Sequence, residues 1–175
     1  PSYVKNLRGV RNWKEAREWL QWRSIEDVEA MTPDLAGVPR GKMMPSVKFT
    51  TETSLALPNA GFRQTITGDY PEETDEFQHD PLDSDLKLMP DLSTLSVVPW
   101  ETDPTAQVIC DIVSTSGKPI LYTPRNLLRH VMGLYDAKGW KAVVAPEIEF
   151  YLVAQNIDPD YPLQTPKGRS GRSVS

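Results

Sequence analysis

The sequence predicts an α+β fold built from two amphipathic helices and several short strands. Apolar residues recur at helical spacing over residues 13–23 and 123–139, whereas several shorter runs have the apolar, β-branched composition of strands. The 16 prolines divide the 175-residue chain into short elements. Apolar residues make up 39% of the chain, which is enough for a core, and the length fits one domain or one and a half.

Composition excludes several classes of protein. A net charge of -5 without a basic stripe argues against nucleic acid and anionic membranes as partners. The chain has no apolar run of about 18 residues and no opening signal peptide, so we expect no membrane span. The single cysteine, Cys110, cannot form an internal disulfide, which favours a cytoplasmic setting. With two histidines and one cysteine, a zinc site is not expected.

The first helix is predicted over about Trp13–Arg23. Asn12 is a suitable N-cap, and Glu15 stands where a capping box has its acidic partner. One face of this helix is rich in tryptophan and carries Trp13, Ala16, Trp19 and Leu20. We expect that face to pack against the body of the protein or a neighbouring subunit rather than to bind a ligand.

A hairpin follows, with strands at Val28–Met31 and from Arg40 and a turn at Asp34–Gly37. From residue type alone, Arg40 and Lys42 are expected to be solvated surface charges. A short helix is predicted over Val47–Leu55. The next strand candidates are 62–67, the part of Asp83–Thr94 that precedes Pro90, 95–100 and 106–113. The Pro90-Asp91 step predicts a hairpin turn between the second and third of these strands. Cys110 is expected in the core, and 114–119 reads as a linker.

The stretch from Asp69 to Asp85 is strongly acidic. Eight of its residues are carboxylates: Asp69, Glu72, Glu73, Asp75, Glu76, Asp80, Asp83 and Asp85. This density is too polar to pack, so we expect a loop. The loop is either simply solvated, or it forms a negatively charged funnel that concentrates a cationic substrate.

The second helix is predicted to begin at Thr123-Pro124, with Thr as N-cap and Pro at the first helical position, and to end at Gly139. It leads into an apolar stretch, Val143–Gln155, whose β-branched and aromatic residues predict a buried strand. Residues from Asn156 onward have the composition of a loop or disordered tail.

Glu147 and Glu149 would project side by side from the same face of this strand, with Cα atoms about 6.5–7 Å apart. Two buried like charges need compensation, and oxygen-only ligands suit Mg²⁺ or Mn²⁺. A strand with one solvated face gives the same alternation, so spacing alone leaves both interpretations open.

Four segments together resemble the glutamine synthetase family, in family order. Asp34–Lys42 resembles its "D-x-x-G-x-x-R-G-K" hairpin, and Ser84–Thr94 resembles its "SD-x-x-L-x-PD-x-ST" segment. Pro124-Arg125 is similar to the "P-R" start of its catalytic helix, and Pro146–Leu152 to its "PE-x-EF" strand. The resemblance extends from about Trp13 to Gly171.

This resemblance implies a β-grasp amino-terminal domain followed by the first helix and strand of an α/β catalytic domain. The implied boundaries are 1–24 for the amino-terminal helix, 25–117 for the β-grasp domain and 118–175 for the truncated start of the catalytic domain. The resemblance also implies that Glu147 and Glu149 each bind one of two divalent ions, Mg²⁺ or Mn²⁺, and that ATP is a substrate. Family members are stacked-ring homo-oligomers with active sites between subunits.

Within the family, Gln64–Pro71 resembles the γ-glutamylpolyamine (γ-glutamylputrescine) synthetase branch. Glutamine synthetases proper carry "F-D-G-S-S" here, where the Asp helps bind ammonium, and this chain lacks that motif. The departure favours a larger amine, bound by a loop that contains Asp69, Tyr70, Glu72 and Glu73.

The expected reaction joins the γ-carboxylate of glutamate to a polyamine such as putrescine through a γ-glutamyl phosphate. The alternatives are glutamine synthetase using ammonium, and a non-catalytic structural or regulatory descendant. Catalytic residues are not assigned, because the family's enzymes continue beyond this segment, and the segment alone is expected to be inactive.

Overall fold

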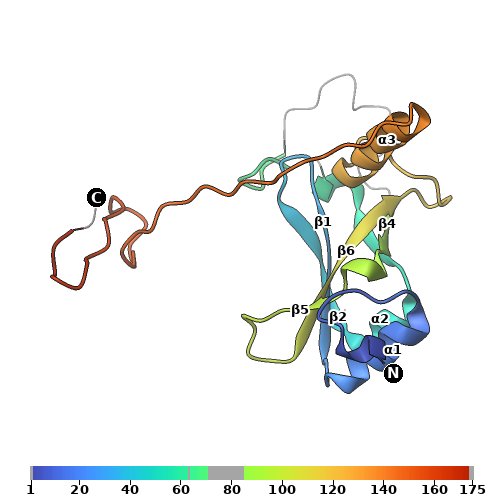
Figure 1. Ribbon diagram of the computed structural model, residues 1–175, viewed down its shortest axis with the longest axis horizontal. Coiled ribbons are helices and arrows are strands. Elements are labelled where there is room, and N and C mark those ends of the chain that lie inside the picture. The colour runs from blue at the N-terminus through green and yellow to red at the C-terminus, as the bar shows by residue number, and fades with distance from the viewer. Residues whose placement is uncertain (1, 63, 71–84, 174–175) are drawn as a thin grey trace. The chain divides into compact units, whose positions relative to one another are not determined.

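The computed structural model describes residues 2–62, 64–70 and 85–173. It divides into two units, Pro1–Trp140 and Lys141–Ser175. The helical elements are η1 (Ser2–Lys5), α1 (Trp13–Trp22), α2 (Ser46–Glu52), η2 (Asn59–Phe62), η4 (Leu92–Thr94) and α3 (Pro124–Ala137). The strands are β1 (Asp27–Pro33), β2 (Pro39–Pro45), β3 (Leu55–Pro58), β4 (Asp85–Pro90), β5 (Ser96–Val97) and β6 (Thr105–Val113), and all six join one sheet (Figure 1).

Strand β6 is the centre of the sheet, whose order is β2-β1-β6-β4-β3. Its first half pairs in parallel with β1, from Asp27↔Thr105 to Met31↔Ile109. Its other edge pairs antiparallel with β4 and, further back, with β5. The alternation over 106–113 predicted this strand, and Cys110 lies in the core as expected.

The predicted hairpin between β4 and β5 is wrong. Both strands pair with β6, one after the other along the same edge, and not with each other. Between β4 and β5 the chain leaves the sheet to form η4. There the Thr94 hydroxyl replaces a strand partner of β6: this hydroxyl accepts the Ile109 N–H at 2.8 Å and donates to the Asp91 carbonyl at 2.7 Å. A side chain therefore satisfies the β6 backbone where the neighbouring strand is interrupted.

Helix α1 begins as the sequence predicts. The Asn12 side chain accepts the Glu15 N–H at 3.0 Å, and the Glu15 carboxylate accepts the Arg11 N–H at 2.9 Å. Its predicted apolar face is buried against the body of the unit, with Trp19 fully inaccessible. Trp13 stacks at a tilt on Phe49 of α2, with ring centroids 5.2 Å apart, so both helices help cover the core (Figure 1).

The hairpin of β1 and β2 is confirmed, with a register from Asp27↔Pro45 to Pro33↔Pro39. The turn of this hairpin, Asp34–Val38, has the same hydrogen bonds as two other turns, Thr65–Asp69 and Ser114–Lys118. In all three, the N–H of the first residue donates to the carbonyl of the fifth. The fourth residue is a glycine with φ between +81° and +88°, and its N–H donates back to the first residue's carbonyl. Only glycine adopts this backbone region freely, which explains the shared Gly position.

The sequence predicts a strand over residues 62–67, but the described residues of this range, 62 and 64–67, are in no strand. Phe62 closes η2 and is buried, and the following turn at Thr65–Asp69 lies outside any described strand. The short helix predicted at 47–55 is confirmed as α2, which ends three residues earlier at Glu52, where Thr53 adopts a left-handed conformation. Leu55 instead starts β3.

Helix α3 begins at Pro124 and ends before Gly139, as predicted, with Gly139 at φ +69°. Its apolar positions stay exposed within the described unit, among them Leu128 at 62%. Polar contacts hold it to the sheet instead: the Asn126 amide donates to the Ile112 carbonyl at 2.5 Å and to the Ile120 carbonyl at 3.1 Å. None of the described helices has the length and apolarity to cross a bilayer.

In the second unit, the buried strand predicted over Val143–Gln155 does not form. The residues from Lys141 to Asn156 are in no described strand, and most side chains are exposed, including Phe150 at 74%. A strand needs a neighbour for its backbone groups, and no described segment supplies one. Within this unit, Ala154 N–H donates to the Gln164 carbonyl at 2.8 Å and closes a loop.

At Gly41 the backbone of β2 lies too close to β1 to leave room for a side chain. A Cβ built at this position would lie 1.9 Å from the Ala30 carbonyl oxygen. We therefore expect Gly41→Ala to lower the free energy of unfolding by more than about 2 kcal/mol, seen as a fall of several degrees in the melting temperature. In Gly133→Ala on α3 the Cβ meets nothing within 4 Å, so stability should be unchanged or slightly higher; equal effects of the two changes would contradict the register.

Candidate functional site

The carboxylate of Asp34 is fully buried in the β1–β2 turn, yet it is completely paired. Its Oδ1 accepts the Ala36 N–H at 2.9 Å and the Val38 N–H at 2.8 Å. Its Oδ2 forms an ion pair with Arg40 Nε at 2.8 Å. The expectation that Arg40 is merely a solvated charge is wrong, since this contact leaves its side chain only 26% exposed.

Arg40 also reaches the turn that contains Asp69. Its Nη2 lies 3.4 Å from the Thr65 carbonyl oxygen, a long hydrogen bond. Within that turn, the Thr65 hydroxyl accepts the Asp69 N–H at 3.1 Å, and the Thr67 hydroxyl donates to the Asp69 carboxylate at 2.7 Å. Asp69 and Tyr70 are both exposed. Glu72 and Glu73, predicted for the same loop, lie outside the described residues.

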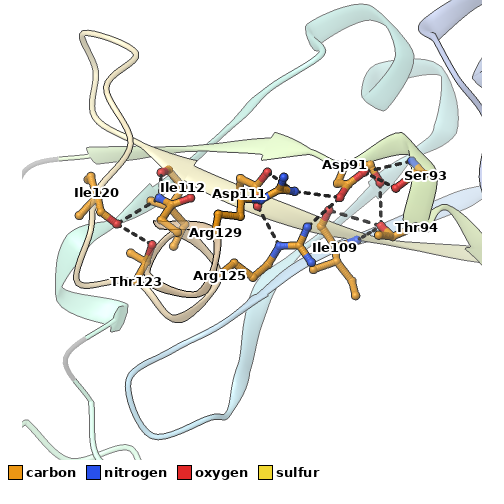
Figure 2. A network of polar contacts seen from close by, with 11 residues as sticks. Asp91, Ser93, Thr94, Ile109, Asp111, Ile112, Ile120, Thr123, Arg125 and Arg129 are labelled. Carbon is orange, nitrogen blue, oxygen red and sulfur yellow. Dashed lines mark hydrogen bonds and ion pairs between the residues drawn. The ribbon is translucent and has the colours of Figure 1, made fainter. Parts of the chain in front are cut away.

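A second polar cluster joins α3 to the sheet (Figure 2). Two guanidinium groups on successive turns of α3 meet two carboxylates, one after β4 and one on β6. Arg125 pairs with Asp91 at 2.7 Å and with Asp111 at 2.8 Å. Arg129 pairs with the same carboxylates at 3.1 Å and 3.0 Å. Each charge therefore has two partners of opposite sign, which makes this cluster a network rather than an isolated surface pair.

Two groups of this network, Asp91 and Arg125, have pKa values shifted by their surroundings. Burial alone raises the pKa of Asp91, but hydrogen bonds from Ser93 and the charge of Arg125 outweigh it and lower that pKa below its ordinary value. Burial lowers the pKa of Arg125, but Asp111 and Asp91 reverse this and raise it. Burial, then the charge of Asp111, raises the pKa of the Cys110 thiol to about 12, so that thiol is inert at neutral pH.

Glu147 and Glu149 lie in the second unit, and both are exposed. The described residues contain no group of three or more His, Cys, Asp or Glu side chains that could hold a metal ion. The role of Glu147 and Glu149 as metal ligands stays a prediction. Carboxylate oxygens are the ligands Mg²⁺ and Mn²⁺ prefer, but two of them leave most of an octahedral shell to be filled by other groups.

Residue type and spacing do not predict that Asp34, Asp91 and Asp111 pair with arginine, as they do in the structure. A signal existed for Asp111, because it interrupts the apolar run of β6 with a charge. For Asp34 and Asp91, the sequence predicts only turn positions. Both accept backbone N–H groups of their turns as well as arginine.

Comparison with protein families gives a match of residues 121–174 to the glutamine synthetase catalytic domain. Among curated proteins, the chain is 33% identical over 146 residues to glutamate–isopropylamine ligase from Pseudomonas sp, which covers 82% of the chain and 32% of that protein. The chain is a relative of the glutamine synthetases. The resemblance seen in its four sequence segments is thereby confirmed.

Other relatives agree. Human lengsin is 31% identical over 134 residues, covering 75% of the chain and 26% of that protein. A glutamine synthetase from Methanococcus maripaludis is 44% identical over 78 residues, covering 42% of the chain and 17% of that protein. The chain thus spans a third or less of the length of these three curated proteins.

Solved structures support the mixed α/β fold. The structure titled "GmaS/ADP complex-Conformation 1" matches with a TM-score of 0.54 at 21% identity, covering 70% of this chain and 25% of that one. A structure described as a novel glutamine synthase homolog matches with a TM-score of 0.53 at 25% identity, covering 65% and 27%. A sheet with a few helices of the glutamine synthetase type is therefore confirmed.

The lowered pKa of Asp91 makes its contribution to stability depend on pH. A carboxyl with a lowered folded pKa stabilises the fold above its unfolded pKa of about 3.9, and this stabilisation is lost as pH falls through the folded value. We expect Asp91→Asn to cost about 1–3 kcal/mol of unfolding free energy at pH 7. The difference from wild type should shrink below about pH 3.9.

Thermal unfolding across pH measures this effect. Asp103→Asn removes an exposed carboxylate outside the network and serves as control, with an expected change within about 0.5 kcal/mol. If Asp91→Asn lowers the free energy of unfolding by the same amount at acid and at neutral pH, the ion pairs of Asp91 do not stabilise the fold.

Proposed function

We propose that the natural-length protein is an ATP-dependent ligase that joins the γ-carboxylate of glutamate to an amine. The observation that carries this proposal is the 33% identity to glutamate–isopropylamine ligase over 82% of this chain. By its name, that relative ligates an amine rather than ammonia. The proposal agrees with the absence of "F-D-G-S-S" at Gln64–Pro71.

The acceptor proposed for this protein is a polyamine such as putrescine. Eight acidic residues between Asp69 and Asp85 provide the negative potential that attracts a second ammonium group. A monoamine has no such group, so this stretch would give it less advantage. Asp69, exposed at the end of its turn, is the described carboxylate we assign to the amine.

For the reaction, ATP would phosphorylate the γ-carboxylate of glutamate, and the amine nitrogen would then displace phosphate to form the amide. Glu147 and Glu149 would each hold one divalent ion, Mg²⁺ or Mn²⁺. Such ions neutralise phosphoryl oxygens during transfer. The remaining ligands and the nucleotide site would come from parts of the protein outside this chain segment, because the aligned region covers only 32% of glutamate–isopropylamine ligase and 26% of human lengsin.

The architecture proposed with this function is a β-grasp domain over 25–117 after an amino-terminal helix at 1–24, with the catalytic domain starting at 118. The family match that begins at residue 121 supports the last boundary. We propose assembly into stacked rings with active sites between subunits. The cytoplasmic location inferred from the single cysteine stays a prediction.

Ammonium is the second candidate acceptor, because the 44% identity to a glutamine synthetase over 78 residues favours it. ADP release by the natural-length protein with ATP, Mg²⁺ and glutamate separates the two. We expect faster release with putrescine or spermidine than with isopropylamine, and the slowest release with ammonium. Fastest release with ammonium would reject the amine proposal, and no release with any acceptor would favour a non-catalytic descendant.

Glu149 tests the metal assignment. Mutating groups that merely orient metal ligands costs about 10- to 100-fold in affinity or activity, so Glu149→Ala should reduce activity at least about 100-fold. The ring assembly should remain intact, as judged by light scattering. Asp160→Ala, which removes an exposed carboxylate of the same unit, should retain activity. Loss of solubility in Glu149→Ala would instead indicate a structural role.

A further inference from the structure

Arg40 connects two turns that are far apart in sequence. Its Nε contacts Asp34 in the β1–β2 turn, and its Nη2 contacts the Thr65 carbonyl in the turn that carries Asp69. Neither the family match, which starts at residue 121, nor the relatives' names assign a role to this residue. The contact therefore needs its own physical explanation.

The direction of the Arg40 guanidinium is fixed by its partner. Asp34 is fully buried and its Oδ1 is already held by two backbone N–H groups, so the carboxylate has little freedom to turn. The guanidinium is planar and rigid, so placing Nε on Asp34 also sets where Nη2 points. A flexible surface arginine would lack this constraint.

The atom that Nη2 reaches is the one that closes the second turn. The Thr65 carbonyl oxygen accepts the Gly68 N–H at 3.0 Å, and Arg40 Nη2 lies 3.4 Å from the same oxygen. The Thr65 N–H donates to the Asp69 carbonyl at 2.8 Å, and Thr67 binds the Asp69 carboxylate. The Thr67 hydroxyl in turn lies 2.9 Å from the Thr65 hydroxyl. A contact that restrains Thr65 therefore also restrains the Asp69 carboxylate.

We propose that Arg40, oriented by Asp34, is a positioning residue that holds the Thr65–Asp69 turn so that Asp69 faces the cationic amine. The amine in this statement rests on the proposed function. The hold on the turn rests only on the contacts of the described residues. An alkylammonium group is the ligand chemistry that an exposed, preoriented carboxylate recognises.

The test uses the natural-length protein with Arg40→Lys, which keeps a positive charge beside Asp34 but lacks the rigid fork. Asp34→Asn is the second variant, because it keeps the arginine and removes its orienting charge. Lys42→Gln, an exposed cation two residues along β2, is the matched control. Hydrogen exchange is followed at the amides of Thr65, Gly68 and Asp69, all of which donate within the turn.

We expect exchange of these three amides to become about tenfold faster in Arg40→Lys and Asp34→Asn and to stay unchanged in Lys42→Gln. The amine KM should rise about tenfold in the same two variants, while the glutamate KM and kcat stay within about twofold. A rise in the amine KM alone, with the glutamate KM and kcat nearly unchanged, distinguishes positioning of the amine from a general loss of structure.

Unchanged exchange in Arg40→Lys overturns the inference, whatever the activity. A parallel rise of the amine and glutamate KM values also overturns it, because the arginine would then act only through global stability. If the wild type uses no amine at all, the proposed function fails, and the exchange measurement alone decides whether Arg40 holds the turn.

Discussion

The first unit depends on the backbone of β6, because both edges of this strand have to be satisfied along its length. One edge takes β1 in parallel, and the other takes β4 and then β5. The second edge is interrupted at η4, where a strand partner is missing for the Ile109 N–H. The Thr94 hydroxyl supplies it, which lets the chain leave the sheet and return without an orphaned amide.

Just before η4, the Asp91 N–H still donates to the Ile109 carbonyl of β6. The Asp91 carboxylate and the Asp111 carboxylate of β6 then lie close enough together for Arg125 to contact both. Two adjacent carboxylates repel unless cations neutralise them, and Arg125 and Arg129 on α3 do so with four contacts (Figure 2). The helix is thus attached to the sheet by charge and by Asn126, while its apolar positions stay exposed in the described unit.

Local signals predicted the local elements well. Asn12 and Glu15 located α1, Thr123-Pro124 and Gly139 bounded α3, and the glycine turn located the β1–β2 hairpin, because each acts through neighbours within a few residues. Pairing was harder to predict. The Pro90-Asp91 step has turn chemistry, but whether the next strand folds back or continues along β6 depends on β6 itself, whose paired residues lie 9 to 26 positions further along the sequence.

The polar site shows the same limit. Residue type suggests that an arginine on an exposed strand is solvated, and it carries no information about a buried carboxylate six residues earlier. The Asp34–Arg40 pair becomes visible only when the turn folds and brings Oδ2 and Nε to 2.8 Å. The "D-x-x-G-x-x-R" spacing therefore has a physical meaning: the turn needs its glycine, and the turn's carboxylate needs its arginine.

The apolar stretch around Glu147 and Glu149 illustrates the opposite case, in which composition predicts an element that its surroundings do not complete. Val143 and Phe150 have strand-forming side chains, but β-propensity expresses packing against neighbours more than an intrinsic backbone preference. Without a paired neighbour among the described residues, the backbone stays free of a ladder and the apolar side chains stay exposed. Burial is also what would make two adjacent carboxylates costly and a divalent ion favourable. Strand pairing and the predicted metal binding would therefore be linked for these two residues, because a partner strand that buries them would at the same time create the need for the ion.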